Sequence, residues 1–78
     1  MPSKPKISLR GLRTFSIAAR YLSFRAAGEE LFITASAVSH QIKSLEDELG
    51  KLLFDRNSRE LSLTETGRSL YEEVSPLI

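Results

Sequence analysis

The segment between Thr34 and Gly50 constrains the fold most strongly, because its apolar residues keep a single clear period. Four of them lie within about 60° of one another around a helical wheel: Val38, Ile42, Leu45 and Leu49. Threonine is a favoured N-cap residue, and glycine adopts the left-handed conformation that ends many helices. The pattern predicts an amphipathic helix that begins after Thr34, ends before Gly50 and needs a core to cover its apolar side.

Two shorter helices are predicted upstream. Ser8 is a plausible N-cap for a helix running to about Tyr21, and Ser23 for a second, shorter helix. The apolar face expected for the first helix consists of Leu9, Leu12, Ser16, Ala19 and Leu22, with Phe15 at its edge. In the second helix, Phe24, Ala27 and Leu31 are expected to point inward.

The second and third predicted helices are joined by the tight connection Ile33-Thr34, which makes them a helix-turn-helix. Gly28 lies inside the second helix and costs about 1 kcal/mol of helix propensity relative to alanine. We therefore expect another helix to pack closely against Gly28.

The pattern changes after Gly50. Residues 53–56 and 61–63 alternate in polarity around a polar turn at 57–60, which predicts a small β-hairpin. Thr64 is expected to cap a fourth helix with one apolar stripe, and Pro76 predicts a kink or an early end. The members of the stripe are Leu70, Val74 and Leu77.

The predicted fold is thus mostly α: a winged helix-turn-helix with a three-helix core and a small β-hairpin wing, followed by a linker helix. We expect a flexible N-terminal arm over residues 1–7, the winged helix-turn-helix domain over 8–63, and the start of the linker helix over 64–78. A chain of 78 residues has room for about one such domain.

Composition excludes several classes of protein. The 41% apolar and 27% charged residues argue against disorder, and no apolar run approaches the ~18 residues of a membrane span. No cysteine is present and His40 is the single histidine, so we expect no metal or other cofactor. An enzyme is not expected either, because Ser39 and His40 are neighbours that point about 100° apart on a helix and form no nucleophile–base pair. Without a secretory signal at the start, a cytoplasmic location is expected.

The charges are segregated, although the net charge is only +1. Six basic residues precede the first acid, Glu29: Lys4, Lys6, Arg10, Arg13, Arg20 and Arg25. The acids gather at 29–30, 46–48 and 72–73. This distribution fits a basic surface for a polyanionic partner. Taken alone, it fits a solvated N-terminal arm with scattered surface charges equally well.

The polar side of the third helix favours DNA as that partner. It carries Ser36, His40, Lys43 and Asp47, with Ser39 and Ser44 at its flanks. Short serines allow close approach to base edges, while His40 and Lys43 reach further. The acids at 46–48 would repel phosphates, so the helix is expected to enter the major groove with its N-terminus first. An ordinary amphipathic helix with a solvated face is the alternative.

The hairpin strengthens the case for DNA. Arg56 and Arg59 are expected at its tip, where they can lie along the DNA backbone or the minor groove, although arginines are also common in surface turns. A helical core, a polar recognition face and a cationic wing follow one another in the chain, and all three are much less expected to coincide by chance than any one of them alone. The alternative function is a helix-turn-helix domain that binds proteins and not DNA.

Several ordered stretches resemble LysR-type transcriptional regulators of bacteria. Residues 22–31 (LSFRAAGEEL) are similar to the second helix of that family, and residues 37–46 (AVSHQIKSLE) to its recognition helix. LG at 49–50, LFDR at 53–56 and LSLTETG at 61–67 are similar to its wing and the start of its linker helix. The resemblance covers about residues 8–72 and is greatest to the branch of glycine-cleavage and β-lactamase activators.

The resemblance implies roles for individual residues. Base-facing positions would be held by Ser36, Ser39 and His40, and also by Ala35. The family often has glutamine where this chain has Ala35, so a methyl group is offered there, to a thymine methyl or to nothing. Contacts to the DNA backbone or from the wing are expected from Ser23, Arg25, Thr34, Lys43, Arg56 and Arg59.

Assembly can also be predicted. A three-helix core cannot fully cover the stripe of Leu70, Val74 and Leu77, so the fourth helix is expected to form a homodimer with a second copy. The DNA partner would then be an interrupted palindromic operator with half-sites spaced in turns of roughly 34 Å. The resemblance also implies a C-terminal effector-binding domain outside this chain, through which a small molecule would act.

Overall fold

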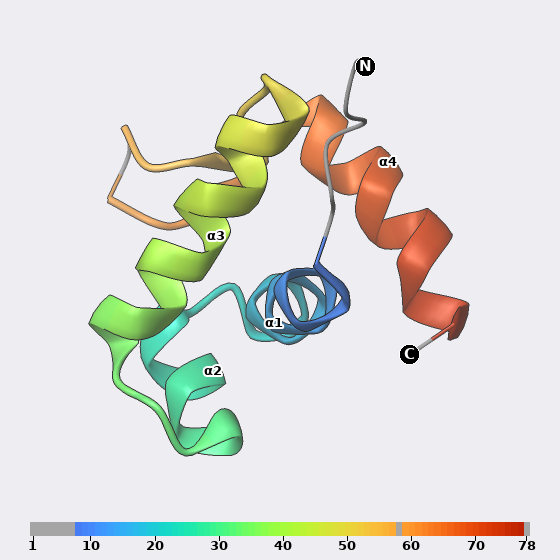
Figure 1. Ribbon diagram of the computed structural model, residues 1–78. Coiled ribbons are helices and arrows are strands. Elements are labelled where there is room, and N and C mark those ends of the chain that lie inside the picture. Colours follow the sequence, from blue (N-terminus) through green and yellow to red (C-terminus); the bar gives the residue numbers. More distant parts are fainter. Residues whose placement is uncertain (1–7, 58, 78) are drawn as a thin grey trace.

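Helices in series form the core, and a short hairpin follows them (Figure 1). The computed structural model describes residues 8–57 and 59–77, so the arm expected over 1–7 lies outside the described residues. The elements are α1 (Leu9–Tyr21), α2 (Phe24–Leu31), α3 (Ala35–Leu49), β1 (Phe54–Asp55), β2 (Ser62–Leu63), α4 (Glu65–Val74) and a 3-10 turn (Ser75–Leu77). In Figure 1, α1 is seen end-on between α3 and α4. This arrangement confirms the mostly α, winged helix-turn-helix fold.

The N-caps predicted from the sequence are confirmed in every described α-helix. The hydroxyl of each cap residue accepts a hydrogen bond from the backbone N–H three residues later, at 3.0–3.2 Å. The caps are Ser8, Ser23, Thr34 and Thr64. Each cap contributes about 1 kcal/mol, because it satisfies an N–H that has no partner within its own helix.

Within residues 8–57 and 59–77, three residues end helices in the left-handed conformation. Gly50 does so with φ 71°, as predicted, and the other two are Leu22 (φ 48°) and Phe32 (φ 61°). Side chains other than glycine rarely adopt this conformation, and Leu22 and Phe32 are both exposed there. The two residues bound α2 and fix the sharp turns on either side of it.

The apolar face expected for α1 is wrong at both ends. Leu9 and Leu22 are exposed, whereas Phe15, expected at the edge, is fully buried with its neighbours Ile17 and Ala18. The reason is that α1 packs against α2 and α3 and also against α4, so its buried surface is broader than one stripe.

The core is centred on the ring of Phe54, which the hairpin inserts among the helices. Its centroid lies 5.6 Å from that of Phe15 and 5.3 Å from that of Phe24, both in edge-to-face geometry. The residues expected on the apolar side of α3 are buried at Val38, Ile42 and Leu45, and half-buried at Leu49.

Close packing at Gly28 is confirmed, although its closest neighbours are the turn at 33–34 and Ala35, the first residue of α3, and not the body of another helix. A Cβ atom on Gly28 would lie 2.5 Å from the carbonyl oxygen of Ile33, so only glycine lets the turn before α3 approach α2 this closely. Gly67 has the same role in α4, where a Cβ would lie 2.0 Å from the carbonyl oxygen of Leu53. These two glycines set the positions of α3 and of the hairpin relative to the helices beside them.

The hairpin is antiparallel, with Phe54 opposite Leu63 and Asp55 opposite Ser62. It confirms the expected hairpin, although each strand is only two residues long. The start of α4 is fastened to the strand region by Thr64, whose hydroxyl donates to the carbonyl oxygen of Leu52 at 2.7 Å. The early end expected near Pro76 is confirmed, because α4 gives way to the 3-10 turn after Val74.

Candidate nucleic-acid interface

The polar residues of α3 share one exposed side of the helix. Ala35, Ser36, His40 and Lys43 are exposed, and Ser39 is half-buried. The opposite side holds the buried residues described above, so α3 cannot rotate to hide its polar side without exposing its apolar one. The structure thus brings together the residues expected to face bases on one accessible side of α3.

A hydrogen bond fixes α3 against the first helix. The hydroxyl of Thr14, itself buried, donates to the side-chain oxygen of Gln41 at 2.6 Å. Gln41 lies next to His40 in sequence, and its side chain points back to α1. A recognition helix must be held rigidly to read base edges, and this bond contributes to that rigidity.

The first turn of α3 is suited to anionic groups. It carries no acidic residue, and the expected backbone contact Thr34 is exposed with its oxygen accepting from the N–H of Ala37. Backbone N–H groups and the helix dipole together favour phosphate at a helix N-terminus. This geometry is consistent with an approach to DNA by the N-terminal end of α3.

The residues expected to reach the backbone from α2 are also accessible. Ser23 is half-buried and caps α2, which leaves its hydroxyl hydrogen able to donate. Arg25 forms an ion pair with Glu29 at 3.7 Å, and both side chains are largely exposed. Such surface pairs contribute about 0–1 kcal/mol, so the guanidinium of Arg25 can exchange this partner for a phosphate.

Arg56, expected at the wing tip, lies directly after β1 and contacts Glu46. Its guanidinium lies 3.4 Å from Oε1 of Glu46 and 5.4 Å from the centre of the Phe24 ring, with the side chain 38% exposed. Arg59, in the loop between the strands, is exposed. Both wing arginines are thus exposed, but Arg56 lies beside Glu46 and Phe24, whereas Arg59 lies further along the loop between the strands.

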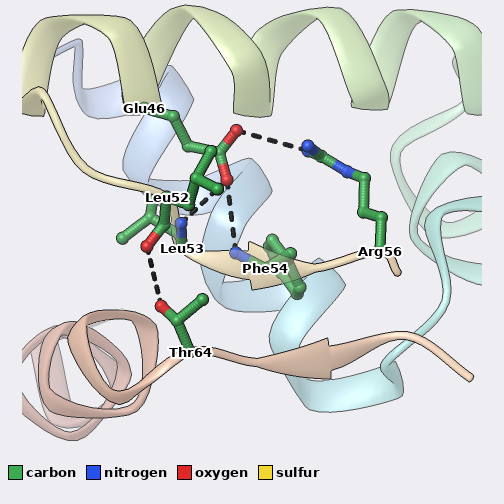
Figure 2. Close-up of polar contacts among 6 residues, drawn as sticks. All are labelled: Glu46, Leu52, Leu53, Phe54, Arg56 and Thr64. Carbon is green, nitrogen blue, oxygen red and sulfur yellow. Dashed lines mark hydrogen bonds and ion pairs between the residues drawn. The ribbon is translucent and has the colours of Figure 1, made fainter. Parts of the chain in front are cut away.

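Glu46 was expected among the acids that repel phosphates, and this was wrong. Its side chain is 3% exposed, and one carboxylate oxygen, Oε2, accepts from the N–H of Leu53 at 2.8 Å and of Phe54 at 3.2 Å (Figure 2). Only Asp47 and Glu48 of that cluster are exposed. The sequence held one signal of this role, since Glu46 lies four residues after Ile42 and hence beside the apolar stripe.

The stripe expected to form the dimer is partly covered within the chain. Val74 is buried and Leu70 packs against the core, because α4 lies against α1. The side chain of Leu77 lies outside the described part of the chain. The three-helix core was expected to leave this stripe incompletely covered, and the structure covers it fully at Val74 and partly at Leu70.

Three further observations concern a shifted pKa, metal binding and membrane spans. The hydrogen bond from the Tyr21 hydroxyl to Glu30, with the negative charge of that carboxylate, raises the pKa of Tyr21 above its ordinary 10.0. Among residues 8–57 and 59–77, no group of histidine and acidic side chains could hold a metal ion. No helix of the described chain is long and apolar enough to cross a membrane.

The sequence is similar to a known protein family and to characterised regulators. Residues 9–68 match the family described as bacterial regulatory helix-turn-helix protein, lysR family. The chain is 55% identical over 75 residues to the glycine cleavage system transcriptional activator of Escherichia coli strain K12, which covers 96% of this chain and 25% of that protein. It is 52% identical over 67 residues to the HTH-type transcriptional activator AmpR of Pseudomonas aeruginosa, covering 86% of this chain and 23% of AmpR. The chain thus spans about a quarter of the length of these relatives.

A solved structure agrees with the sequence relatives. The crystal structure of the BenM_DBD/catB site 1 DNA complex matches with a TM-score of 0.85 and 37% identity, covering 90% of this chain and 75% of that one. The match to the family extends over more than half of the chain, and it includes α1, α2, α3 and the hairpin. This chain therefore belongs to the LysR family of bacterial regulatory helix-turn-helix proteins.

Proposed function

We propose that this chain binds double-stranded DNA sequence-specifically, as the DNA-binding module of a bacterial LysR-type transcriptional regulator. The observation that carries the proposal is the exposed polar side of α3, with Ser36, His40 and Lys43 in one row beside the hairpin. An α-helix fits the major groove of B-DNA, where each base pair shows a distinct pattern of donors and acceptors. The likeness to the BenM_DBD/catB site 1 DNA complex supports the same mode of docking.

The residues divide into two roles under this proposal. Positions that face bases are Ala35, Ser36, Ser39 and His40. Positions that contact the backbone are Ser23, Arg25, Thr34 and Lys43, with Arg59 reaching from the wing. Backbone contacts fix the register of the protein on the duplex, and base contacts discriminate among sequences.

Assembly on DNA follows from the fourth helix. We propose that residues 64–78 begin a linker helix that pairs with its copy in a homodimer through Leu70 and Leu77, with Val74 shared with the chain's own core. The operator would be an interrupted palindrome. The whole protein, of which this chain matches about a quarter in its relatives, would work in the cytoplasm and carry an effector-binding domain. Sedimentation of a longer chain that includes the full linker helix tests the dimer, and a monomer at millimolar concentration would contradict it.

Selection from a randomised duplex pool tests sequence-specific binding. We expect the wild-type protein to enrich one consensus, and His40→Ala to lose roughly 1–3 kcal/mol on the best duplex while relaxing one or two base positions per half-site. Ser44→Ala is the matched control, because Ser44 is exposed one turn further along α3 and is assigned no contact. An unchanged consensus with His40→Ala would reduce His40 to a backbone contact.

The salt dependence of binding tests the backbone contacts. Log K should fall linearly with log salt, and Arg59→Ala should reduce the magnitude of that slope by about 1 if one phosphate contact is lost. If the wild-type protein shows no enrichment and no retention of duplex at low salt, the DNA-binding proposal is wrong and a helix-turn-helix that binds proteins takes its place.

A further inference from the structure

The contact between Glu46 and Arg56 joins the recognition helix to the wing. Glu46 belongs to the last part of α3, and Arg56 follows directly after β1. One carboxylate oxygen accepts from two backbone N–H groups of the strand region, those of Leu53 and Phe54, and the other lies 3.4 Å from the guanidinium (Figure 2). A single buried side chain thus meets three groups of the hairpin.

Arg56 also reaches a third element. Its guanidinium lies 5.4 Å from the centre of the Phe24 ring, at the start of α2, and the same ring packs edge-to-face against Phe54. Burial of a carboxylate is costly unless charge and hydrogen bonds compensate it, and Glu46 has both. The pair of Glu46 and Arg56, called here the Glu46–Arg56 pair, therefore joins α2, α3 and β1 at one point.

The hairpin needs such a support. Each strand has two residues, and a hairpin of this size does not hold its shape in water by itself. Besides Glu46, the ties that fix it are the Phe54 ring in the core and the bonds from Thr64 to the carbonyl oxygens of Leu52 and Leu53. Among the hydrogen bonds named here, those to Glu46 link the hairpin to the recognition helix, so Glu46 bears directly on the angle between that helix and the wing.

We propose that Glu46 and Arg56 are positioning residues for DNA recognition: they orient the wing so that Arg59 and α3 contact the same duplex together. In this arrangement Arg56 neutralises Glu46 and does not itself bind phosphate. The inference rests on the proposed DNA binding, because it assigns Arg59 to the backbone contact made by the wing. The sequence alone indicated the opposite, that Arg56 is a wing cation in contact with DNA.

The competing arrangement is that Arg56 leaves Glu46 and binds a phosphate when DNA arrives. The two arrangements predict opposite results for Glu46→Gln. Glutamine retains an oxygen that can accept from Leu53 and Phe54, but its NH2 group cannot pair with a guanidinium. Glu46→Gln therefore releases Arg56 from its partner. DNA binding should become weaker if Arg56 positions the wing, and stronger if Arg56 is a phosphate ligand.

The experiment measures the salt slope of binding for the wild type and for Arg59→Ala, each alone and combined with Glu46→Gln or Arg56→Met. Glu48→Gln is the matched control, since it removes the same charge from the same helix at an exposed position. We expect Arg59→Ala to reduce the slope by about 1 in the wild-type and Glu48→Gln backgrounds, and by about half of that or less in the other two. A structural effect of lost charge on α3 would appear in the Glu48→Gln background as well, so a smaller effect of Arg59→Ala that is confined to the Glu46→Gln and Arg56→Met backgrounds reports on the Glu46–Arg56 pair.

Circular dichroism of every variant at the assay temperature establishes that it is folded before binding is compared. If Glu46→Gln unfolds the protein, Arg56→Met provides the same test, because the Arg56 side chain is partly exposed and its replacement disturbs the core less. A reduction of about 1 by Arg59→Ala in all backgrounds overturns the proposal, as does Arg56→Met lowering the slope by about 1 while Glu46→Gln tightens binding. Failure of the wild type to bind any duplex would instead refute the proposed function.

Discussion

Gly28 offers a sharp test of the packing between the two helices of the helix-turn-helix. A Cβ atom at this position would lie 2.5 Å from the carbonyl oxygen of Ile33, 3.2 Å from the carbonyl carbon of Thr34 and 3.3 Å from the nitrogen of Ala35. All three neighbours are backbone atoms, so no side-chain rotation can make room. Gly28 also accepts at its own carbonyl from the N–H of Ile33 at 2.9 Å, which holds the turn in place.

Two effects of Gly28→Ala oppose each other. Alanine gains about 0.5–1 kcal/mol over glycine inside a helix. Overpacking typically costs about 1–3 kcal/mol, and the upper part of that range applies here because the contacts are with backbone. The net loss should be about 2 kcal/mol. A domain of this length is stable by roughly 4–12 kcal/mol, so the loss is a substantial part of the total.

Gly11→Ala is the matched control. A Cβ on Gly11, in the first turn of α1, would meet only the Cβ of Ser8, at an ordinary 3.8 Å. Thermal unfolding followed by circular dichroism should show the melting temperature falling by about 8–16 °C for Gly28→Ala and rising by about 2–8 °C for Gly11→Ala. If Gly28→Ala melts at or above the wild-type temperature, the turn can move away from α2 and the argument from fixed backbone contacts is refuted.

Three further outcomes are expected. Thr34→Ala should cost about 1 kcal/mol in urea unfolding, because the N–H of Ala37 loses its cap, whereas Thr34→Ser should stay close to wild type. Phe54→Ala should cost about 3–5 kcal/mol, since it empties the space between two other rings, and a native circular dichroism spectrum that persists to the wild-type melting temperature would contradict this. Glu30→Gln should lower the pKa of Tyr21 toward its ordinary value, seen by NMR titration of the ring. Because the folded pKa of Tyr21 is raised, its stabilising contribution is present below pH 10.0 and is lost as pH rises through the folded pKa, so wild type and variant should differ in pH dependence only in strong alkali.

Local features of this fold could be predicted from the sequence because their causes are local. An N-cap needs one hydroxyl and the N–H three residues on, and the end of α3 needs one glycine, so both follow from residue type and spacing. The left-handed Leu22 and Phe32 could not be predicted, since neither residue type favours that conformation. They are held in it by the packing of the helices that they join.

Part of the candidate site could likewise be predicted from local sequence, and part could not. Helical periodicity alone places Ser36, His40 and Lys43 on the exposed side of α3. The burial of Glu46 and its contact with Arg56 depend on a hairpin that folds back across α3, which periodicity along one helix cannot show. The charge of Glu46 was therefore assigned to solvent although it is buried, and its partner Arg56 was assigned to DNA although it lies beside that buried carboxylate.

The shortness of the hairpin has a consequence for the order of folding. The three helices of the core are close in sequence and make local contacts, which form in microseconds to milliseconds in small helical domains. Strands of two residues gain little from each other, so β1 and β2 can pair only after α1 and α2 offer a surface for Phe54. We expect mutations in the hairpin to accelerate unfolding and to leave the folding rate nearly unchanged. During synthesis, the helices would then reach their native arrangement before the wing does.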